Sequence, residues 1–76
     1  MIVSAHELNI HNVINFGSAK NKKLGKVTLI ASLNPQMKII EGNCLKTGVL
    51  LQSREVNEQP ICVFDEQYIK HYLSSE

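Results

Sequence analysis

The sequence predicts a small α+β domain, with an antiparallel sheet of four to five strands followed by one C-terminal helix. Apolar and polar residues alternate along residues 26–33, which is typical of a strand with one buried face. Within residues 64–73 apolar residues instead recur at spacings of three and four, as on one face of a helix, and Asp65 is well suited to cap the N-terminus of that helix. Because the strands come before a single helix, the 76 residues are expected to form one α+β domain, residues 1–76.

The N-terminal segment fits two structures. Ser4 followed by Glu7 is a capping-box pattern and Gly17 is a suitable stop, which together predict a helix. At a period of two, however, four apolar residues share one face: Leu8, Ile10, Ile14 and Phe16. A strand over about residues 7–16 is favoured, and a helix within residues 4–16 is the alternative.

The central segment predicts a hairpin and two further strands. The strand at 26–33 is expected to bury four residues, Val27, Leu29, Ala31 and Leu33. Turn residues at 34–36, including Pro35, lead into its antiparallel partner, which Gly42 and Asn43 are expected to end. A strand bounded by Gly48 and a last, short strand follow at residues 47–56 and 61–64.

The last element is expected to be an amphipathic helix packed on the sheet. Asp65 is a good N-cap, and Phe64 and Ile69 occupy the positions of a hydrophobic staple. Glu66 suits the positive end of the helix dipole, whereas Lys70 and His71 suit its negative end.

Composition favours a homodimer over a monomer. A chain of 76 residues buries only about 60% of its unfolded surface, and without tryptophan its core is mainly aliphatic. A second copy supplies missing apolar contacts in such small domains. Charge is also uneven, since the stretch from Leu8 to Ile40 contains five lysines and no acidic residue, while most acidic residues follow it. Such asymmetry favours contact with a polyanion or between copies.

No motif in the sequence predicts catalysis, a metal site or a cofactor. Cys44 and Cys62 are isolated and lie in apolar runs, so buried, reduced thiols are favoured while a disulfide stays open. His6 and His11 are assigned to the solvent side of the first strand, and neither forms a nucleophile motif with a cysteine. The protein is therefore expected not to be an enzyme. No signal peptide or membrane span is apparent, which makes a cytoplasmic protein the expectation.

The basic loop at residues 17–26 is the candidate for function. Its lysines are expected to neutralise nucleic-acid phosphates, without base readout: Lys20, Lys22, Lys23 and Lys26. Lys38 and Arg54 extend this track if they share a face, whereas Phe16 is expected in the core rather than stacked on a base. A merely solvated loop is the alternative. A competing class is a small protein-binding module, such as a phage or mobile-element inhibitor that docks on a host protein through its acidic half or a strand edge.

Over most of the chain, about residues 7–73, short motifs resemble the SpoVG septation-regulator family, small dimeric bacterial proteins that bind nucleic acid. The residues that carry this resemblance are Ile30-Ala31-Ser32-Leu33, Gly48-Val49-Leu50-Leu51 and Gln52-Ser53-Arg54. The resemblance implies a regulatory DNA- or RNA-binding homodimer, with Ser53 and Arg54 at the family's Ser-basic step.

The chain also departs from that family. Gln52 replaces a proline, the segment 41–48 is shorter, the loop 17–26 is longer and more basic, and a basic C-terminal tail is missing. A second resemblance links residues 63–67, Val-Phe-Asp-Glu-Gln, to the single-stranded-DNA-binding domain of the PC4 transcription coactivators. Both resemblances imply a dimeric nucleic-acid-binding protein.

Overall fold

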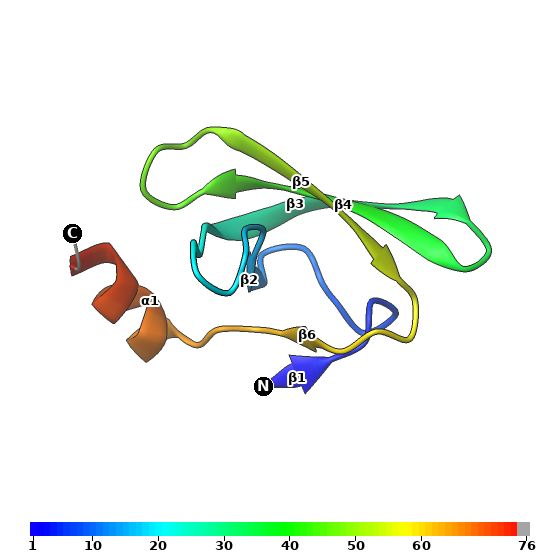
Figure 1. Ribbon diagram of the computed structural model, residues 1–76, viewed down its shortest axis with the longest axis horizontal. Helices are drawn as coiled ribbons and strands as arrows, with labels where there is room; N and C mark the ends of the chain where they lie inside the picture. Colours follow the sequence, from blue (N-terminus) through cyan, green and yellow to red (C-terminus); the bar gives the residue numbers. More distant parts are fainter. Residues whose placement is uncertain (75–76) are drawn as a thin grey trace.

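A computed structural model describes residues 1–74 and confirms the predicted α+β class (Figure 1). Its main feature is a four-stranded antiparallel sheet in the order β2-β3-β4-β5, and β1 pairs with β6 in a separate two-stranded ribbon. The elements are β1 (Ile2–Val3), β2 (Val13–Asn15), β3 (Leu24–Asn34), β4 (Met37–Cys44), β5 (Leu50–Val56), β6 (Ile61–Cys62) and α1 (Glu66–Ser74).

The hairpin of β3 and β4 closes where its turn residues predict. Asn34 pairs with Met37 across the two strands. The Asn34 side-chain oxygen accepts hydrogen bonds from the N–H groups of Gln36 (2.8 Å) and Met37 (2.9 Å). Proline between them presets the turn, because its φ is fixed and it has no N–H to satisfy.

Gly42 and Asn43 do not end β4, contrary to the sequence-based expectation, since the strand runs on to Cys44. The glycine instead makes room for Phe16. A Cβ at Gly42 would lie 2.9 Å from the tip of the Phe16 ring, and a Cβ at Gly25 would lie equally close to that ring. Phe16 packs against the core cluster, as expected. A strand glycine here marks close approach of another group rather than a strand end.

A β-bulge reverses the expected burial along the second half of β3. The register shifts between Val27, opposite Gly42, and Leu29, opposite Glu41. One extra residue transfers the side chains that follow it to the other face, up to a second register shift between Ser32 and Asn34. Ile30 therefore packs against the core, and the prediction that Leu29, Ala31 and Leu33 are buried is wrong. Leu29 and Leu33 are 43% and 44% exposed.

The N-terminal segment is neither the predicted long strand nor the alternative helix. Only Val13–Asn15 is strand, while residues 5–7 and 10–11 are turns. Ser4 and Glu7 do form the side-chain contact of a capping box, with the Ser4 N–H donating to a Glu7 carboxylate oxygen at 3.1 Å, but no helix follows. His11 turns the chain with a φ of 83°, and its N–H donates to the Val27 carbonyl at 2.8 Å. His6 and His11 are exposed, as expected, but both lie in turns and not on the solvent side of a strand.

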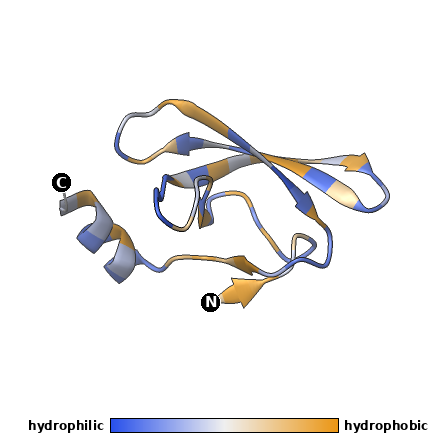
Figure 2. Cartoon of the chain, in the orientation of Figure 1, coloured by the Kyte–Doolittle hydropathy of each residue, from blue (hydrophilic) through white to orange (hydrophobic). Residues whose placement is uncertain are grey.

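The core lies between the four-stranded sheet and a second layer formed by β1, β6 and the segment 4–12 (Figure 1). Its buried cluster combines residues of the sheet with residues of the second layer: Ala5, Leu8, Ile14, Val27, Ile40, Ile61 and Val63. The partly buried Val3 of β1 packs against this cluster. The opposite, outer face of the sheet is uncovered in the single chain, and Figure 2 shows hydrophobic residues distributed along its strands as well as along β1 and β6. Leu29, Leu33 and Val56 are exposed large apolar residues of this outer face.

Helix α1 begins at the predicted cap. The Asp65 carboxylate accepts the N–H of Tyr68 at 2.8 Å, which satisfies a donor of the first helical turn. The helix does not pack across the sheet as expected, because none of its residues is buried. It lies instead at one end of the molecule, beside the loop between β2 and β3 (Figure 1). Tyr68 and Tyr72 make its contacts with that loop.

Both cysteines are free thiols, so the expectation of reduced cysteines agrees with the structure. Their expected burial does not, since Cys44 is half-buried and Cys62 is exposed.

Candidate nucleic-acid interface

The basic loop between β2 and β3 is folded around one asparagine. The Asn15 side-chain oxygen accepts the N–H groups of Gly17 and Lys23, each at 2.9 Å, and so joins the two ends of the loop. Within the loop the Ser18 hydroxyl accepts the N–H of Asn21 at 3.0 Å. The lysines are therefore presented on a hydrogen-bonded loop at the end of the sheet.

Lys22 is tied to the helix. Its ammonium group donates to the Tyr68 hydroxyl at 2.9 Å and lies 5.4 Å from the centre of that ring. The hydrogen bond to Tyr68 raises the pKa of Lys22, which keeps its positive charge at every physiological pH. One turn further along α1, the Tyr72 hydroxyl accepts the N–H of Leu24 at 3.3 Å and donates to the Lys22 carbonyl at 3.5 Å. The two tyrosines thus fix the loop against α1.

A second lysine contacts α1 from the turn between β4 and β5. The Lys46 ammonium lies 4.3 Å from the centre of the Tyr72 ring, within the range of a cation–π contact. This turn bends at Gly48, whose φ is 75°, and its N–H donates to the Cys44 carbonyl at 2.8 Å.

Together these segments form what we term the basic hollow, a concavity of about 380 Å³. It is lined by Asn21, Lys22, Lys23, Cys44, Lys46, Thr47, Val49, Leu51 and Tyr72. Among the described residues that line it, none is acidic. Because focused positive charge on low-dielectric walls attracts anions, the basic hollow is suited to phosphate groups.

Cys44 contributes the basic hollow's only thiol among the described lining residues. A hydrogen bond from the Thr47 hydroxyl lowers the pKa of this thiol most, and the Thr47 N–H adds to it. Partial burial opposes the shift, whereas the Lys46 N–H and the charge of Lys23 reinforce it. The thiolate is therefore favoured relative to an ordinary cysteine.

The remaining predicted binding residues are spread over the sheet. Lys20 is exposed on the loop and Lys26 is exposed on β3, where it pairs with Val13 and Asn43. Arg54 is exposed and lies opposite Ile39, on the outer face.

Lys38 and Ser53 lie on the other face of the sheet, and both are engaged there. The Lys38 ammonium is 3.5 Å from the Ser32 hydroxyl, and Lys38 pairs directly with Glu55. The Ser53 hydroxyl donates to the Glu55 carboxylate at 3.2 Å. Since successive side chains of a strand alternate between faces, Lys38 and Arg54 do not share a face and do not form one track.

Three residues of the interface escaped the sequence-based prediction: Lys46, Tyr68 and Tyr72. Lys46 is separated from the loop in sequence and lies in the acidic half of the chain. The distribution of charge along the sequence therefore did not group it with the lysines of the loop. The tyrosines were visible as part of the helical stripe, but that pattern is equally typical of core packing.

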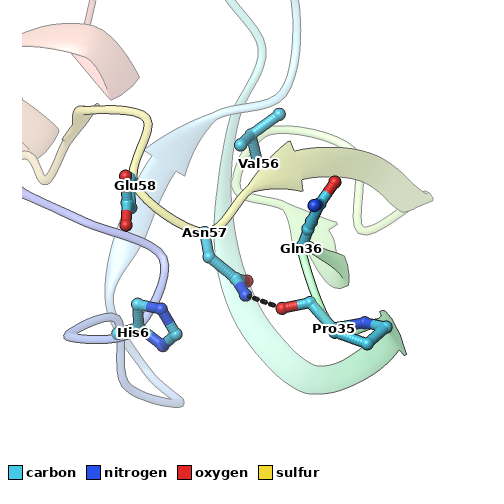
Figure 3. Close-up of a pocket in the computed structure, with 6 residues that line it drawn as sticks. All are labelled: His6, Pro35, Gln36, Val56, Asn57 and Glu58. Atoms are coloured by element: carbon cyan, nitrogen blue, oxygen red, sulfur yellow. Dashed lines mark hydrogen bonds between the residues drawn. The ribbon is translucent and has the colours of Figure 1, made fainter.

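A second hollow, of about 330 Å³, lies near the other end of the sheet (Figure 3). It is lined by His6, Pro35, Gln36, Val56, Asn57 and Glu58. The Asn57 amide donates to the Pro35 carbonyl at 2.9 Å, while its side-chain oxygen is buried without a partner among the described residues. Glu58 and the unpaired oxygen disfavour an anion here, so this hollow does not extend the basic interface.

Within residues 1–74, no group of three or more His, Cys, Asp or Glu side chains is placed to hold a metal ion. In the same part of the chain, no helix has the length and hydropathy needed to cross a membrane.

Fold and surface together define a small α+β domain with a lysine-lined concavity beside its only described helix. No protein-family model matches the chain, and no curated protein or solved structure with which it was compared matches it either. The resemblances to the septation regulators and to the coactivator domain therefore stay predictions.

Proposed function

We propose that this protein is a non-catalytic, nucleic-acid-binding regulator that contacts DNA or RNA phosphates through the basic hollow. The observation that supports this most is the convergence of Lys22, Lys23 and Lys46 from two separate loops on one concavity whose described lining has no acidic residue. Lys20 and Lys26 extend the positive surface beside it. Lysine contacts of this kind bind the phosphate backbone without reading base sequence.

The lysines are also held in a way that suits a binding surface. Lys22 and Lys46 are oriented by the two tyrosines of α1, so less side-chain freedom is lost when they meet a phosphate. Ser53 and Arg54, proposed from the family resemblance, lie away from the basic hollow on β5. Arg54 lies on the outer face of the sheet and Ser53 is already bonded to Glu55, so neither residue belongs to the contact proposed here.

The test is the salt dependence of binding. We expect the wild-type protein to bind mixed single- and double-stranded probes at low salt, with a log–log slope of about −2 to −3 if three phosphates are neutralised. The double variant Lys22→Gln/Lys23→Gln is expected to lose about 1.4 to 1.8 of that slope and to weaken binding to all sequences alike.

Lys70 supplies the matched control. It is exposed on α1 and does not line the basic hollow, so Lys70→Gln removes charge elsewhere. Thermal denaturation of each variant separates a loss of affinity from a loss of folding, since Lys22 also contacts Tyr68. Absence of binding by the wild-type protein at about 50 mM salt, or an equal loss in Lys70→Gln, would refute the proposal.

We also propose that the functional unit is a homodimer that pairs through the outer face of the four-stranded sheet. The support is the exposed apolar surface formed by Leu29, Leu33 and Val56 in a chain whose buried core is small. Covering these side chains with a second copy is favourable, because apolar surface is costly to leave in water.

Molar mass by light scattering tests this pairing. We expect a dimer for the wild-type chain and a monomer for Leu29→Lys. Ile10→Lys is the control, because Ile10 is an exposed apolar residue outside the sheet. A monomeric wild-type protein at about 100 μM, or equal dissociation in both variants, would contradict a dimer on this face.

A further inference from the structure

Cys44 lines the basic hollow but has no part in the proposed phosphate binding. Its thiol is half-buried, it lines the same concavity as Lys22, Lys23 and Lys46, and it forms no disulfide. A cysteine surrounded in this way is not an ordinary core thiol, because its walls carry positive charge and the space beside it is about 380 Å³.

The turn between β4 and β5 builds hydrogen-bond donors around the sulfur. The Thr47 hydroxyl oxygen accepts the N–H of Val49 at 3.3 Å, which leaves its O–H for Cys44. The backbone N–H groups of Lys46 and Thr47 also favour the charged sulfur, and together these groups lower the pKa of the thiol. The charged and titratable groups that face it across the basic hollow are Lys22, Lys23, Lys46 and Tyr72.

We propose that Cys44 is a modification site at which an anionic disulfide of the glutathione type docks on the lysines of the basic hollow and forms a mixed disulfide. The lysines meet the carboxylates of the incoming molecule, and the same positive charge stabilises the attacking thiolate. A thiol alone would not define such a site. Its combination with a concavity and a lysine cluster selects both the reaction and the charge of the reagent.

The reaction is a thiol–disulfide exchange. The Cys44 thiolate attacks one sulfur of the disulfide, a new S–S bond forms, and the old S–S bond breaks with its electron pair leaving on the other sulfur. The departing thiolate takes a proton from solvent. The oxidant is the disulfide itself, so no further co-reactant is required, and a reducing thiol reverses the step.

One consequence rests on the proposed function. A bound glutathionyl group fills the basic hollow and adds carboxylates beside Lys22, Lys23 and Lys46, so it is expected to weaken nucleic-acid binding. Oxidation would thus release the nucleic acid, and reduction would restore binding.

The second free cysteine allows an internal comparison. Cys62 is exposed and Cys44 is half-buried, so solvent access alone predicts that the Cys62 thiol reacts faster. The variants Cys44→Ser and Cys62→Ser each leave one thiol, and two aromatic disulfides serve as probes: dithiobis(nitrobenzoate), a dianion, and dithiodipyridine, which is neutral.

We expect Cys44 to react faster than Cys62 with the anionic probe and to lose that advantage with the neutral one. In the Cys62→Ser background, Lys23→Gln is expected to slow the anionic probe about two- to fivefold, the range for losing one exposed charge interaction, while Lys70→Gln leaves the rate unchanged. The rate at Cys44 should reach half its plateau at a pH below the value of about 8.5 for a free cysteine. Faster reaction at Cys62 with both probes, or equal effects of the two lysine variants, would overturn the modification site.

Glutathione disulfide then tests the consequence. Mass spectrometry of the wild-type protein should place the adduct on Cys44, and the adduct should bind a nucleic-acid probe at least about tenfold more weakly, as expected for the loss of two phosphate contacts at moderate salt. An adduct that binds as well as the reduced protein would refute the regulatory consequence. Selective reaction at Cys44 in a protein that binds no nucleic acid would support the modification site and refute the proposed function.

Discussion

Replacing Gly42 by alanine tests how closely Phe16 and two strands are packed. The added methyl group would lie 2.5 Å from the Lys26 carbonyl oxygen and 2.9 Å from the Phe16 ring tip. Both distances are shorter than real Cβ contacts, and the nearer atom belongs to the backbone of the neighbouring strand, which cannot rotate away.

The magnitude follows from two opposing terms. Overpacking a well-packed interior costs about 1 to 3 kcal/mol, occasionally more. Alanine returns about 0.4 to 1 kcal/mol, because it restricts the unfolded chain relative to glycine. Since the clash involves backbone, we expect a value at the upper end, with a net destabilisation of about 2 kcal/mol. For a domain of this size that lowers Tm by about 8 to 16 °C.

Urea denaturation followed by far-ultraviolet circular dichroism measures the free energy of unfolding directly. Gly25→Ala is the matched comparison, because its two closest contacts are both carbon atoms of the Phe16 ring. Phe16→Leu should therefore rescue much of the loss in Gly25→Ala and little of the loss in Gly42→Ala. An unchanged stability in Gly42→Ala, or its full rescue by Phe16→Leu, would refute the packing described for this face.

Three further changes test single contacts. Asp65→Ala removes the helix cap and is expected to lower the free energy of unfolding by about 0.5 to 2 kcal/mol, with a loss of helical ellipticity; an unchanged spectrum would contradict capping. Tyr72→Phe removes the hydroxyl that joins α1 to Leu24 and should cost about 1 kcal/mol in urea denaturation, with exchange of the Leu24 amide accelerated; unchanged exchange would count against the contact. Asn57→Asp places a charge against the Pro35 carbonyl and is expected to cost about 1 to 3 kcal/mol near pH 7; equal stability at pH 7 and pH 3, relative to wild type at each pH, would argue against that repulsion.

Much of the fold could be predicted because local signals agreed with tertiary structure. The turn at Pro35, the strand after Gly48 and the cap at Asp65 all lie where their chemistry places them. In each case the determining contact is between residues close in sequence, such as Asp65 with Tyr68. A single sequence contains that information.

The errors arose where distant residues decide the outcome. The alternation along β3 is regular in sequence, but the bulge after Val27 depends on pairing with Glu41 and Gly42 and reverses the buried face. In the sequence Gly42 resembles a residue that ends a strand, because only the fold places the Phe16 ring against it. His11 adopts a left-handed conformation that is uncommon for residues other than glycine, and its N–H bonds to the distant Val27 carbonyl, so the sequence alone does not locate the bend.

The candidate interface shows the same division. The lysines at positions 20 to 26 were apparent from charge density alone, and three of them lie on one loop. Their partner Lys46 and the tyrosines that hold them were not, because only the fold brings the turn between β4 and β5 to the side of α1.

The basic hollow also links ligand binding to the stability of the protein. Folding brings Lys46, from the turn between β4 and β5, to the same concavity as Lys22 and Lys23, so this cluster of three lysines exists only in the native state. A multivalent anion that occupies the concavity therefore binds only the native state, which raises the melting temperature by mass action. Sulfate or phosphate should therefore protect the protein against heat more than chloride does at equal ionic strength, which makes thermal stability itself a sensor of occupancy.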